Sequence, residues 1–122
     1  MNKKILVCDD NTDILEMLVL LLETSGYDVI SESKSPNIFN IIAEENPGLV
    51  IVDLWMPMLP GDIIVKQLRT VPATQFLPVI VISACIDGQK MAEAAGATHF
   101  ISKPFDIFNL LDKVEQYYAQ AS

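Results

Sequence analysis

The stretch Gly48-Leu-Val-Ile-Val-Asp53-Leu-Trp-Met-Pro-Met-Leu-Pro-Gly61 passes from an apolar run to a carboxylate and then into a loop with two prolines. A short β-branched run bounded by turn formers is typical of a strand that is buried on both faces. Asp53 therefore stands where a buried strand emerges into a loop. In open parallel α/β sheets, ligands bind at that end of the strands. Taken alone, such a carboxylate could equally cap the next element or accept hydrogen bonds from loop amides.

Four further short runs read as strands, and each of the five is followed by a helical pattern. The candidate strands cover residues 4–8, 27–32, 49–52, 78–82 and 99–101, and the helices after them end near residues 25, 45, 70, 95 and 119. Strands that alternate with helices predict a parallel sheet with helices on both faces and right-handed crossovers. We therefore expect one domain over residues 1–122, a flavodoxin-like, doubly wound (βα)5 fold of the α/β class. Its five-stranded parallel sheet has the order 2-1-3-4-5.

The last of these helices has apolar residues at helical spacing. They predict a core-facing stripe formed by Ile107, Phe108, Leu111, Val114 and Tyr118.

Composition excludes several classes of function. The 122-residue chain has a net charge of -8, which argues against a nucleic-acid-binding surface, because neutralising phosphates requires Lys and Arg. The same charge disfavours an anionic membrane surface. Cys8 and Cys85 show neither CxxC spacing nor a cluster with histidine, so a zinc site is not expected. The apolar run behind the N-terminal lysines is too short for a signal peptide or a membrane span, and we expect a cytoplasmic protein.

Polar side chains follow four of the five strands. Asp9 and Asp10 follow the first strand, Asp53 ends the third, Ser83 follows the fourth and Lys103 follows the fifth. Parallel strands bring these positions to one edge, with the first and third strands adjacent. Close carboxylates repel one another, and a hard divalent cation such as magnesium or manganese relieves that repulsion. Since a carboxylate can act as a nucleophile toward phosphorus, the pattern predicts a phosphoryl-transfer site.

These residues carry a resemblance to the receiver domain of two-component response regulators, over essentially the whole chain. Asp9-Asp10 resembles the acidic pair of that family, and Asp53–Gly61 resembles its phosphoacceptor strand and loop. Ser83-Ala84 is similar to the hydroxyl residue followed by a small one, and Lys103-Pro104-Phe105 to the lysine with its cis proline.

The resemblance implies a signalling phosphoacceptor in a phosphorelay. Asp53 would accept the phosphoryl group of a histidine kinase or histidine phosphotransfer protein, and the domain would catalyse its own phosphorylation and dephosphorylation without being an enzyme for other substrates. Ser83 and Lys103 would contact the phosphoryl oxygens. Mg2+, with no organic cofactor, would be held by Asp10, Asp53, the backbone carbonyl of Trp55 and, through water, Asp9.

The resemblance also implies a switch. Phe100 occupies the position of an aromatic residue that turns inward as the loop after Ser83 closes. The face made by the fourth helix, the fifth strand and the last helix would change, and it would bind a downstream effector or a second copy. Ser83 and Phe100 stand where threonine and tyrosine are commoner. Trp55 and Cys85 occupy loop positions that tune dephosphorylation, and we expect the bulk of Trp55 to slow hydrolysis.

Phosphodonor partners of this family dock beside the first helix and the loop after the fifth strand. The docking candidates are Ile14, Met17, Val19 and Phe105, which could equally be ordinary surface apolar residues.

Two other functions remain open at this point. A magnesium-dependent phosphatase with an aspartyl nucleophile usually has a DxD pattern on its first strand, whereas this strand ends Asp9-Asp10-Asn11. A flavodoxin-like binding module without phosphorylation is the other, but the sequence lacks a Gly-rich phosphate loop. The sequence also leaves open whether the domain stands alone or belongs to a longer chain.

Overall fold

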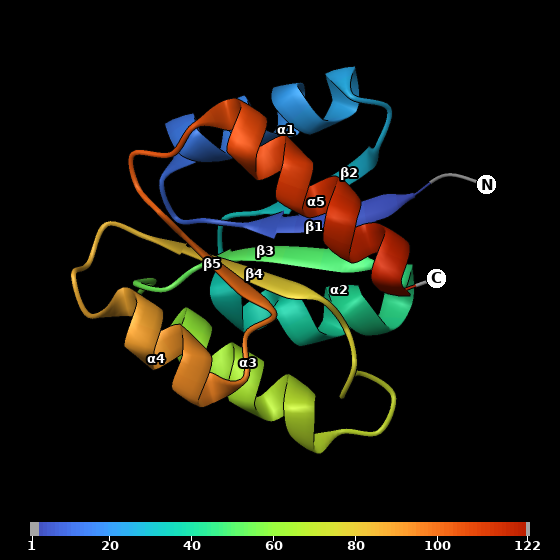
Figure 1. The fold of residues 1–122 in the computed structure, drawn as a ribbon. Helices are drawn as coiled ribbons and strands as arrows, with labels where there is room; N and C mark the ends of the chain where they lie inside the picture. The colour runs from blue at the N-terminus through green and yellow to red at the C-terminus, as the bar shows by residue number, and fades with distance from the viewer. Residues whose placement is uncertain (1–2, 122) are drawn as a thin grey trace.

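Five parallel strands form the centre of the protein in the computed structural model, which describes residues 3–121 (Figure 1). The strands are β1 (Lys4–Cys8), β2 (Asp28–Glu32), β3 (Leu49–Asp53), β4 (Val79–Ser83) and β5 (His99–Ser102). The helices are α1 (Thr12–Thr24), α2 (Ile38–Glu45), α3 (Gly61–Thr70), α4 (Gly88–Ala95) and α5 (Ile107–Ala121), and a 3-10 turn, η1 (Ser35–Asn37), precedes α2. The order β2-β1-β3-β4-β5 confirms the predicted topology.

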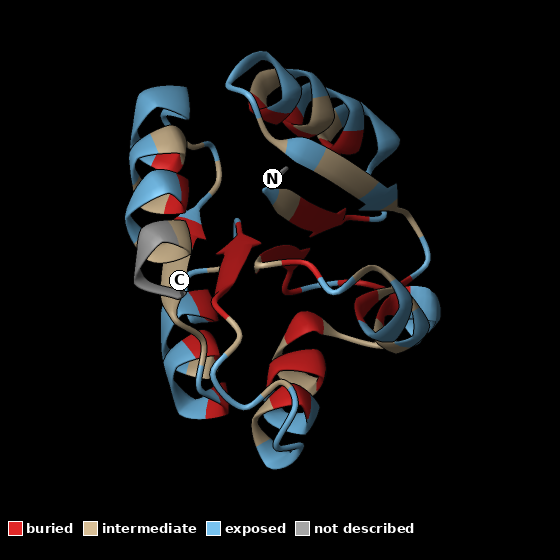
Figure 2. Ribbon diagram, turned by 90° about the vertical axis from the view of Figure 1, so that its right-hand side faces the viewer, coloured by how far each residue is buried: buried red, intermediate tan, exposed pale blue. Residues whose placement is uncertain are grey.

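The sheet lies between two layers of helices. α1 and α5 cover one face, and α2, α3 and α4 cover the other (Figure 1). Side chains alternate along each central strand, so that β1 contributes Leu6 to one core and Ile5 to the other. Figure 2 shows the buried residues on the central strands and on the inner faces of the helices. None of the described helices, all within residues 3–121, has the length and apolar character needed to cross a bilayer.

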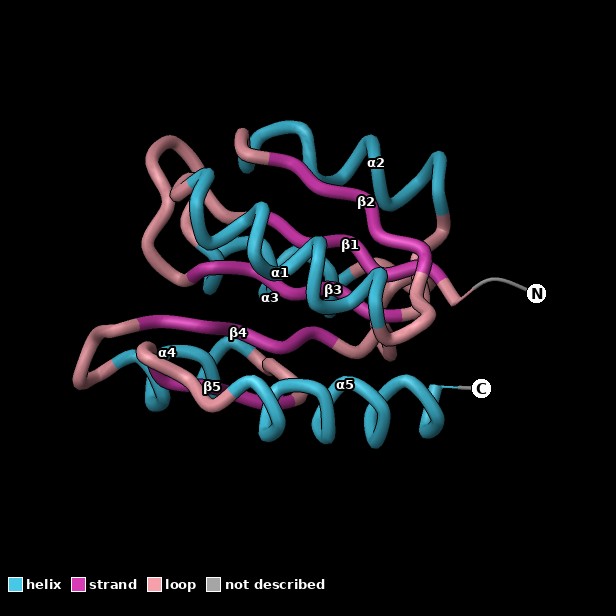
Figure 3. Tube along the Cα trace, turned by 90° about the horizontal axis from the view of Figure 1, so that it is seen from above, coloured by secondary structure: helices cyan, strands magenta, loops and turns pink. Residues whose placement is uncertain are grey.

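The register of the strands brings their carboxyl ends level. Cys8 pairs with Val52, Asp53 with Ile82, and Ser83 with Ser102. The loops that follow the strands therefore lie together at one end of the sheet (Figure 3). Every polar residue singled out at a strand end in the sequence belongs to this edge.

The start of α1 shows why two adjacent acids have different surroundings. Asn11 caps the helix, because its side-chain oxygen accepts hydrogen bonds from the amides of Asp13 at 3.1 Å and Ile14 at 3.2 Å. Asp9 lies before the cap and accepts the amide of Asn11 at 2.9 Å. Asp9 is thereby turned into the molecule and is buried, whereas Asp10 is exposed.

The stripe predicted for the last helix is partly wrong. Among residues 107–118 of this helix, Leu110 and Val114 are buried, while Phe108 is 77% exposed. The helix begins at Ile107, because the Asp106 carboxylate accepts the amide of Phe108 at 2.8 Å. Apolar residues occur on two adjacent faces of this helix, and only packing against the sheet selects between them.

Candidate functional site

Three carboxylates meet at the carboxyl edge of the sheet. Asp9 follows β1, Asp53 ends the neighbouring β3, and both are buried, while Asp10 stays exposed at the rim. One oxygen from each carboxylate lies within 4.8 Å of those of the other two. The acid pair and the acid on β3, far apart in the sequence, therefore form one cluster.

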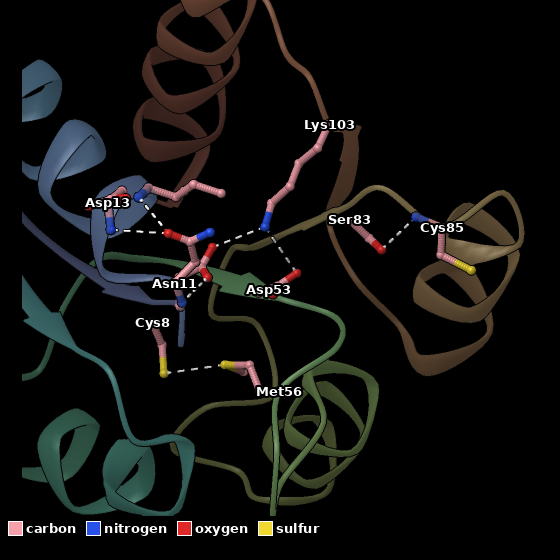
Figure 4. Close-up of polar contacts among 10 residues, drawn as sticks. Cys8, Asn11, Asp13, Asp53, Met56, Ser83, Cys85 and Lys103 are labelled. Carbon is pink, nitrogen blue, oxygen red and sulfur yellow. Dashed lines mark hydrogen bonds and ion pairs between the residues drawn. The ribbon is translucent and has the colours of Figure 1, made fainter.

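Lys103 extends from the end of β5 into this cluster. Its Nζ lies 3.2 Å from Oδ2 of Asp9 and 3.4 Å from Oδ1 of Asp53, as Figure 4 shows for the contact with Asp53. The peptide bond between Lys103 and Pro104 is cis, as the sequence motif implied. One ammonium group faces three carboxylates, so the cluster keeps an excess of negative charge.

This excess is reflected in the acid strength of Asp53. Burial raises the pKa of the Asp53 carboxyl above its ordinary value, and the nearby Asp9 carboxylate raises it further. The attraction of Lys103 lowers the pKa of Asp53 but does not cancel these two effects. A second cation at the cluster would therefore stabilise the ionised form of Asp53.

The donor set fits a hard divalent cation. Carboxylate oxygens, with an exposed member in Asp10 that leaves the rim open to water, suit Mg2+ or Mn2+. Cys8, the nearest thiol along β1, does not compete as a ligand. Burial, followed by the charge of Glu32, raises the pKa of the Cys8 thiol to about 12, and its Sγ lies 3.7 Å from Sδ of Met56. Cys8 is thus a buried thiol of the core.

Ser83 ends β4 beside the cluster and is buried. Its hydroxyl oxygen accepts the amide of Cys85 at 3.0 Å (Figure 4), so the hydroxyl is engaged with its own loop in this structure.

Phe100 lies close to Ser83, from the adjacent strand β5. A Cβ atom added to Gly88 would lie 3.0 Å from Cε1 and Cζ of the Phe100 ring and 3.3 Å from Cβ of Ser83. The half-buried ring therefore packs under the first turn of α4, next to the serine. The serine and the ring therefore both lie against the start of α4.

Exposed apolar side chains stand on the loops at the same edge of the sheet as the cluster. Trp55 is 51% exposed two residues after Asp53, Met58 protrudes from the same loop, and Ile86 protrudes from the loop after β4. Of the docking candidates, Met17 is exposed, whereas Ile14, Val19 and Phe105 are half-buried. Ile107 and Phe108, which the sequence assigned to the core, add exposed apolar surface at the start of α5.

Comparisons with known proteins agree with this geometry. Residues 5–115 match the family model of the response regulator receiver domain. The chain is 38% identical over 122 residues to the response regulator GtcR of Aneurinibacillus migulanus. This alignment covers 98% of this chain and 48% of that protein. It is 32% identical over 120 residues to sporulation initiation phosphotransferase F of Bacillus subtilis (strain 168), covering 96% of this chain and 94% of the relative. Among solved structures, the receiver domain of a Francisella response regulator superimposes with a TM-score of 0.90 at 27% identity, over 99% of this chain and 100% of the other.

Proposed function

This chain belongs to the response regulator receiver domain family and is a phosphorylatable signalling domain of two-component systems, and we propose that Asp53 is its phosphoacceptor. The observation that carries the proposal is the position of Lys103, whose ammonium lies between the buried carboxylates of Asp53 and Asp9. An ammonium at that place can neutralise charge on a phosphoryl group that is being transferred to Asp53.

The transfer forms one bond and breaks another. An oxygen of the Asp53 carboxylate attacks the phosphorus of a phosphohistidine, the phosphorus–nitrogen bond breaks, and the imidazole leaves with the electron pair and takes up a proton. Lys103 and the hydroxyl of Ser83 hold the phosphoryl oxygens. The phosphodonor is a histidine kinase or a histidine phosphotransfer protein, and a small phosphodonor serves as well because the chain supplies the catalytic groups itself. Water later attacks the same phosphorus, the bond between the Asp53 oxygen and phosphorus breaks, and inorganic phosphate leaves, which restores the carboxylate.

The metal assignment combines the carboxylate cluster with the family resemblance. Asp10 and Asp53 would hold Mg2+ directly and Asp9 through water, and the resemblance implies the backbone carbonyl of Trp55 as a further ligand. When bound, the cation neutralises charge on the phosphoryl oxygens.

Phosphorylation would switch the fold by drawing Ser83 toward the phosphoryl group. The hydroxyl would then give up its bond to the amide of Cys85, and the adjacent Phe100 ring would move further inward as the loop closes. The changed surface is that of α4, β5 and α5, which would bind a downstream effector or a second copy of the chain.

The proposed function also includes a docking surface for the phosphodonor and a cytoplasmic location for the protein. A phosphodonor would dock on Ile14, Met17, Val19 and Phe105, which lie on α1 and in the loop after β5. We place the protein in the cytoplasm, where the free thiols of Cys8 and Cys85 would stay reduced.

Mass spectrometry tests the acceptor assignment. The protein incubated with Mg2+ and acetyl phosphate should gain one phosphoryl group, and Asp53→Asn should gain none. Asp13→Asn, which removes an exposed carboxylate from α1, is the matched control and should be phosphorylated like the wild type. A phosphoryl group that persists in Asp53→Asn would place the acceptor elsewhere.

A further inference from the structure

Ser35 lies outside the acidic cluster, yet it is tied to the loop that leaves Asp53. It begins η1, the turn between β2 and α2, and is 2% exposed. Its hydroxyl donates a hydrogen bond to the carbonyl oxygen of Pro57, at 3.1 Å. Since β1 lies between β2 and β3 in the sheet, this bond joins loops of strands that are not neighbours.

The carbonyl that Ser35 holds belongs to a strained turn. Pro57 O also accepts the amide of Leu59 at 2.9 Å, and the residue between them, Met58, has a φ of +73°. A bond from residue i to i+2 around a positive φ is a γ-turn of the rare, strained kind. Strain of this sort persists only where the surroundings over-determine the backbone.

The side chain of Met58 gives the turn little support of its own, because it is 88% exposed. The rest of the loop is fastened elsewhere: the amide of Gly61 donates to Leu54 O at 2.9 Å, and Met56 is buried against Cys8. Ser35 supplies a buried side-chain bond to the turn itself. It therefore acts next to Met58, whose positive φ is unfavourable for a residue with a side chain.

We infer that Ser35 is a positioning residue for the divalent cation. By holding the Pro57 carbonyl it keeps the γ-turn in place, and so fixes the backbone of Trp55 two residues earlier. The inference rests on the proposed function, in which the Trp55 carbonyl is a metal ligand. Ser35 itself touches neither the metal nor the phosphoryl group.

Without the hydroxyl, Pro57 O keeps only the amide of Leu59, and Met58 can return to a negative φ. The chain on both sides of Met58 must then shift, since the loop is pinned at Leu54 and Gly61. Trp55 lies inside that span, and its neighbour Met56 is held through its side chain, at Cys8. The peptide planes on either side of Met56 can therefore turn, and the Trp55 carbonyl would lose its fixed orientation. The carboxylates of Asp9 and Asp10 would keep theirs, because they follow β1.

Trp55 is the single tryptophan of the sequence, so its fluorescence reports on the loop directly. We would titrate Mg2+ into the wild type, Ser35→Ala and Ser33→Ala, the last being a half-buried serine of the same segment. Ser35→Ala should weaken Mg2+ binding about tenfold, the low end of the cost of losing a direct partner of a ligand, because Ser35 acts on the Trp55 carbonyl through Pro57. Ser33→Ala should bind within about twofold of wild type, because it leaves the bond between Ser35 and Pro57 intact.

A double-mutant cycle tests the route through the strained turn. Glycine adopts positive φ without strain, so Met58→Gly should hold the turn even without the serine. In a Met58→Gly background, the loss caused by Ser35→Ala should shrink to about twofold. An unchanged tenfold loss in that background would overturn the proposed route.

Phosphorylation by acetyl phosphate adds a second readout. Ser35→Ala should need more Mg2+ for half-maximal rate but approach the wild-type rate at saturating Mg2+, because Lys103 and Ser83 are untouched. A rate that stays low at saturation would instead point to general damage and overturn the inference. Ser35→Cys, similar in size but a weak donor, replaces Ser35→Ala if circular dichroism shows that the alanine variant does not fold.

Mg2+ binding by the wild type and by Ser35→Ala distinguishes a failure of the role of Ser35 from a failure of the proposed function. A wild-type protein that shows no Mg2+ binding, by fluorescence or calorimetry, would remove both the proposed ligand set and the role of Ser35. Binding that is equal in the wild type and in Ser35→Ala would remove the role of Ser35 alone.

Discussion

Two loops leave neighbouring strands at the same edge of the sheet, and they are held very differently. The loop after β3, residues 54–60, is bonded to Ser35 and to Cys8, which lie 22 and 48 residues from their partners in the sequence. The loop after β4, residues 84–87, makes local bonds, from the Cys85 amide to Ser83 and from the Gly88 amide to Cys85. Its Ile86 is 98% exposed.

The difference matches the work proposed for each loop. Residues 54–60 would carry a metal ligand, the Trp55 carbonyl, and ligands bind best when they are already in place. Residues 84–87 follow the serine that would turn toward the phosphoryl group, and loops with few tertiary contacts open and close at low cost. The proposed site would thus combine a fixed loop on the metal side with a movable loop on the phosphoryl side.

Gly61→Ala should give the largest effect, because it breaks the fixed loop at its base. A Cβ at Gly61 would collide with the backbone carbonyl of Asp53, which cannot move without disturbing β3. The free energy of unfolding should fall by about 3 kcal/mol, as for severe overpacking. Urea denaturation measures this loss. Gly26→Ala is the control. A Cβ there would meet no neighbouring atom, but the backbone has a φ of +98°, so the free energy of unfolding should fall by only about 1–2 kcal/mol.

A pair of alanine substitutions compares the loops directly. Met56→Ala should cost about 2 kcal/mol of unfolding free energy, since a buried side chain is lost from the core. Ile86→Ala should stay within about 0.5 kcal/mol of the wild type, because the side chain makes almost no contact. Equal losses in the two variants would contradict the contrast between the loops.

The raised pKa of Asp53 predicts that the ionised carboxylate lowers the stability of the folded protein, and that this loss depends on pH. Burial and Asp9 make the folded protein hold this proton more tightly than the unfolded chain does. Stability therefore falls as the pH rises from the ordinary carboxyl pKa through the raised one, and the full cost is present at neutral pH. Asp53→Asn, which carries no charge there, should melt a few degrees higher than the wild type at pH 7 without Mg2+.

Scanning calorimetry at several pH values checks this prediction. The advantage of Asp53→Asn should shrink as the pH is lowered toward 4 and both proteins become uncharged at this position. Added Mg2+ should also narrow the difference in melting temperature between the two proteins, because the wild type binds the ion more tightly. An advantage that is independent of pH would mean that charge is not the cause.

Trp55→Ala should have the smallest effect. The quantity that it changes is the lifetime of the phosphoryl group on Asp53. The half-exposed indole stands two residues from Asp53, where it can restrict the approach of water. Loss of phosphate should become about threefold faster, which corresponds to roughly 0.6 kcal/mol of activation free energy. A radiolabelled phosphate time course measures it. Phe76→Ala, at an exposed aromatic residue outside the described site, serves as the control and should lose phosphate at the wild-type rate.

The sequence was sufficient for the fold because the signals that specify it are local. Apolar runs of strand length, each followed by a helical pattern, predict parallel strands, and β3 passes from Leu49 to Asp53 without a polar residue between them. The parallel arrangement then brings the strand ends together whatever the details of packing. For that reason Asp9, Asp53, Ser83 and Lys103 could be grouped before any coordinates were known.

Tertiary structure alone decided the features that depend on contacts between segments. Asp9 and Asp10 are equivalent in the sequence, but only Asp9 is buried, because its carboxylate turns in to accept the amide of Asn11. Likewise, no local pattern marks Ser35 as the partner of Pro57, since their bond depends on how η1 and the loop after β3 meet across the end of β1. The spacing of apolar residues indicates which side chains of one helix or strand are buried. Contacts between two loops depend instead on strand order, register and crossover length together.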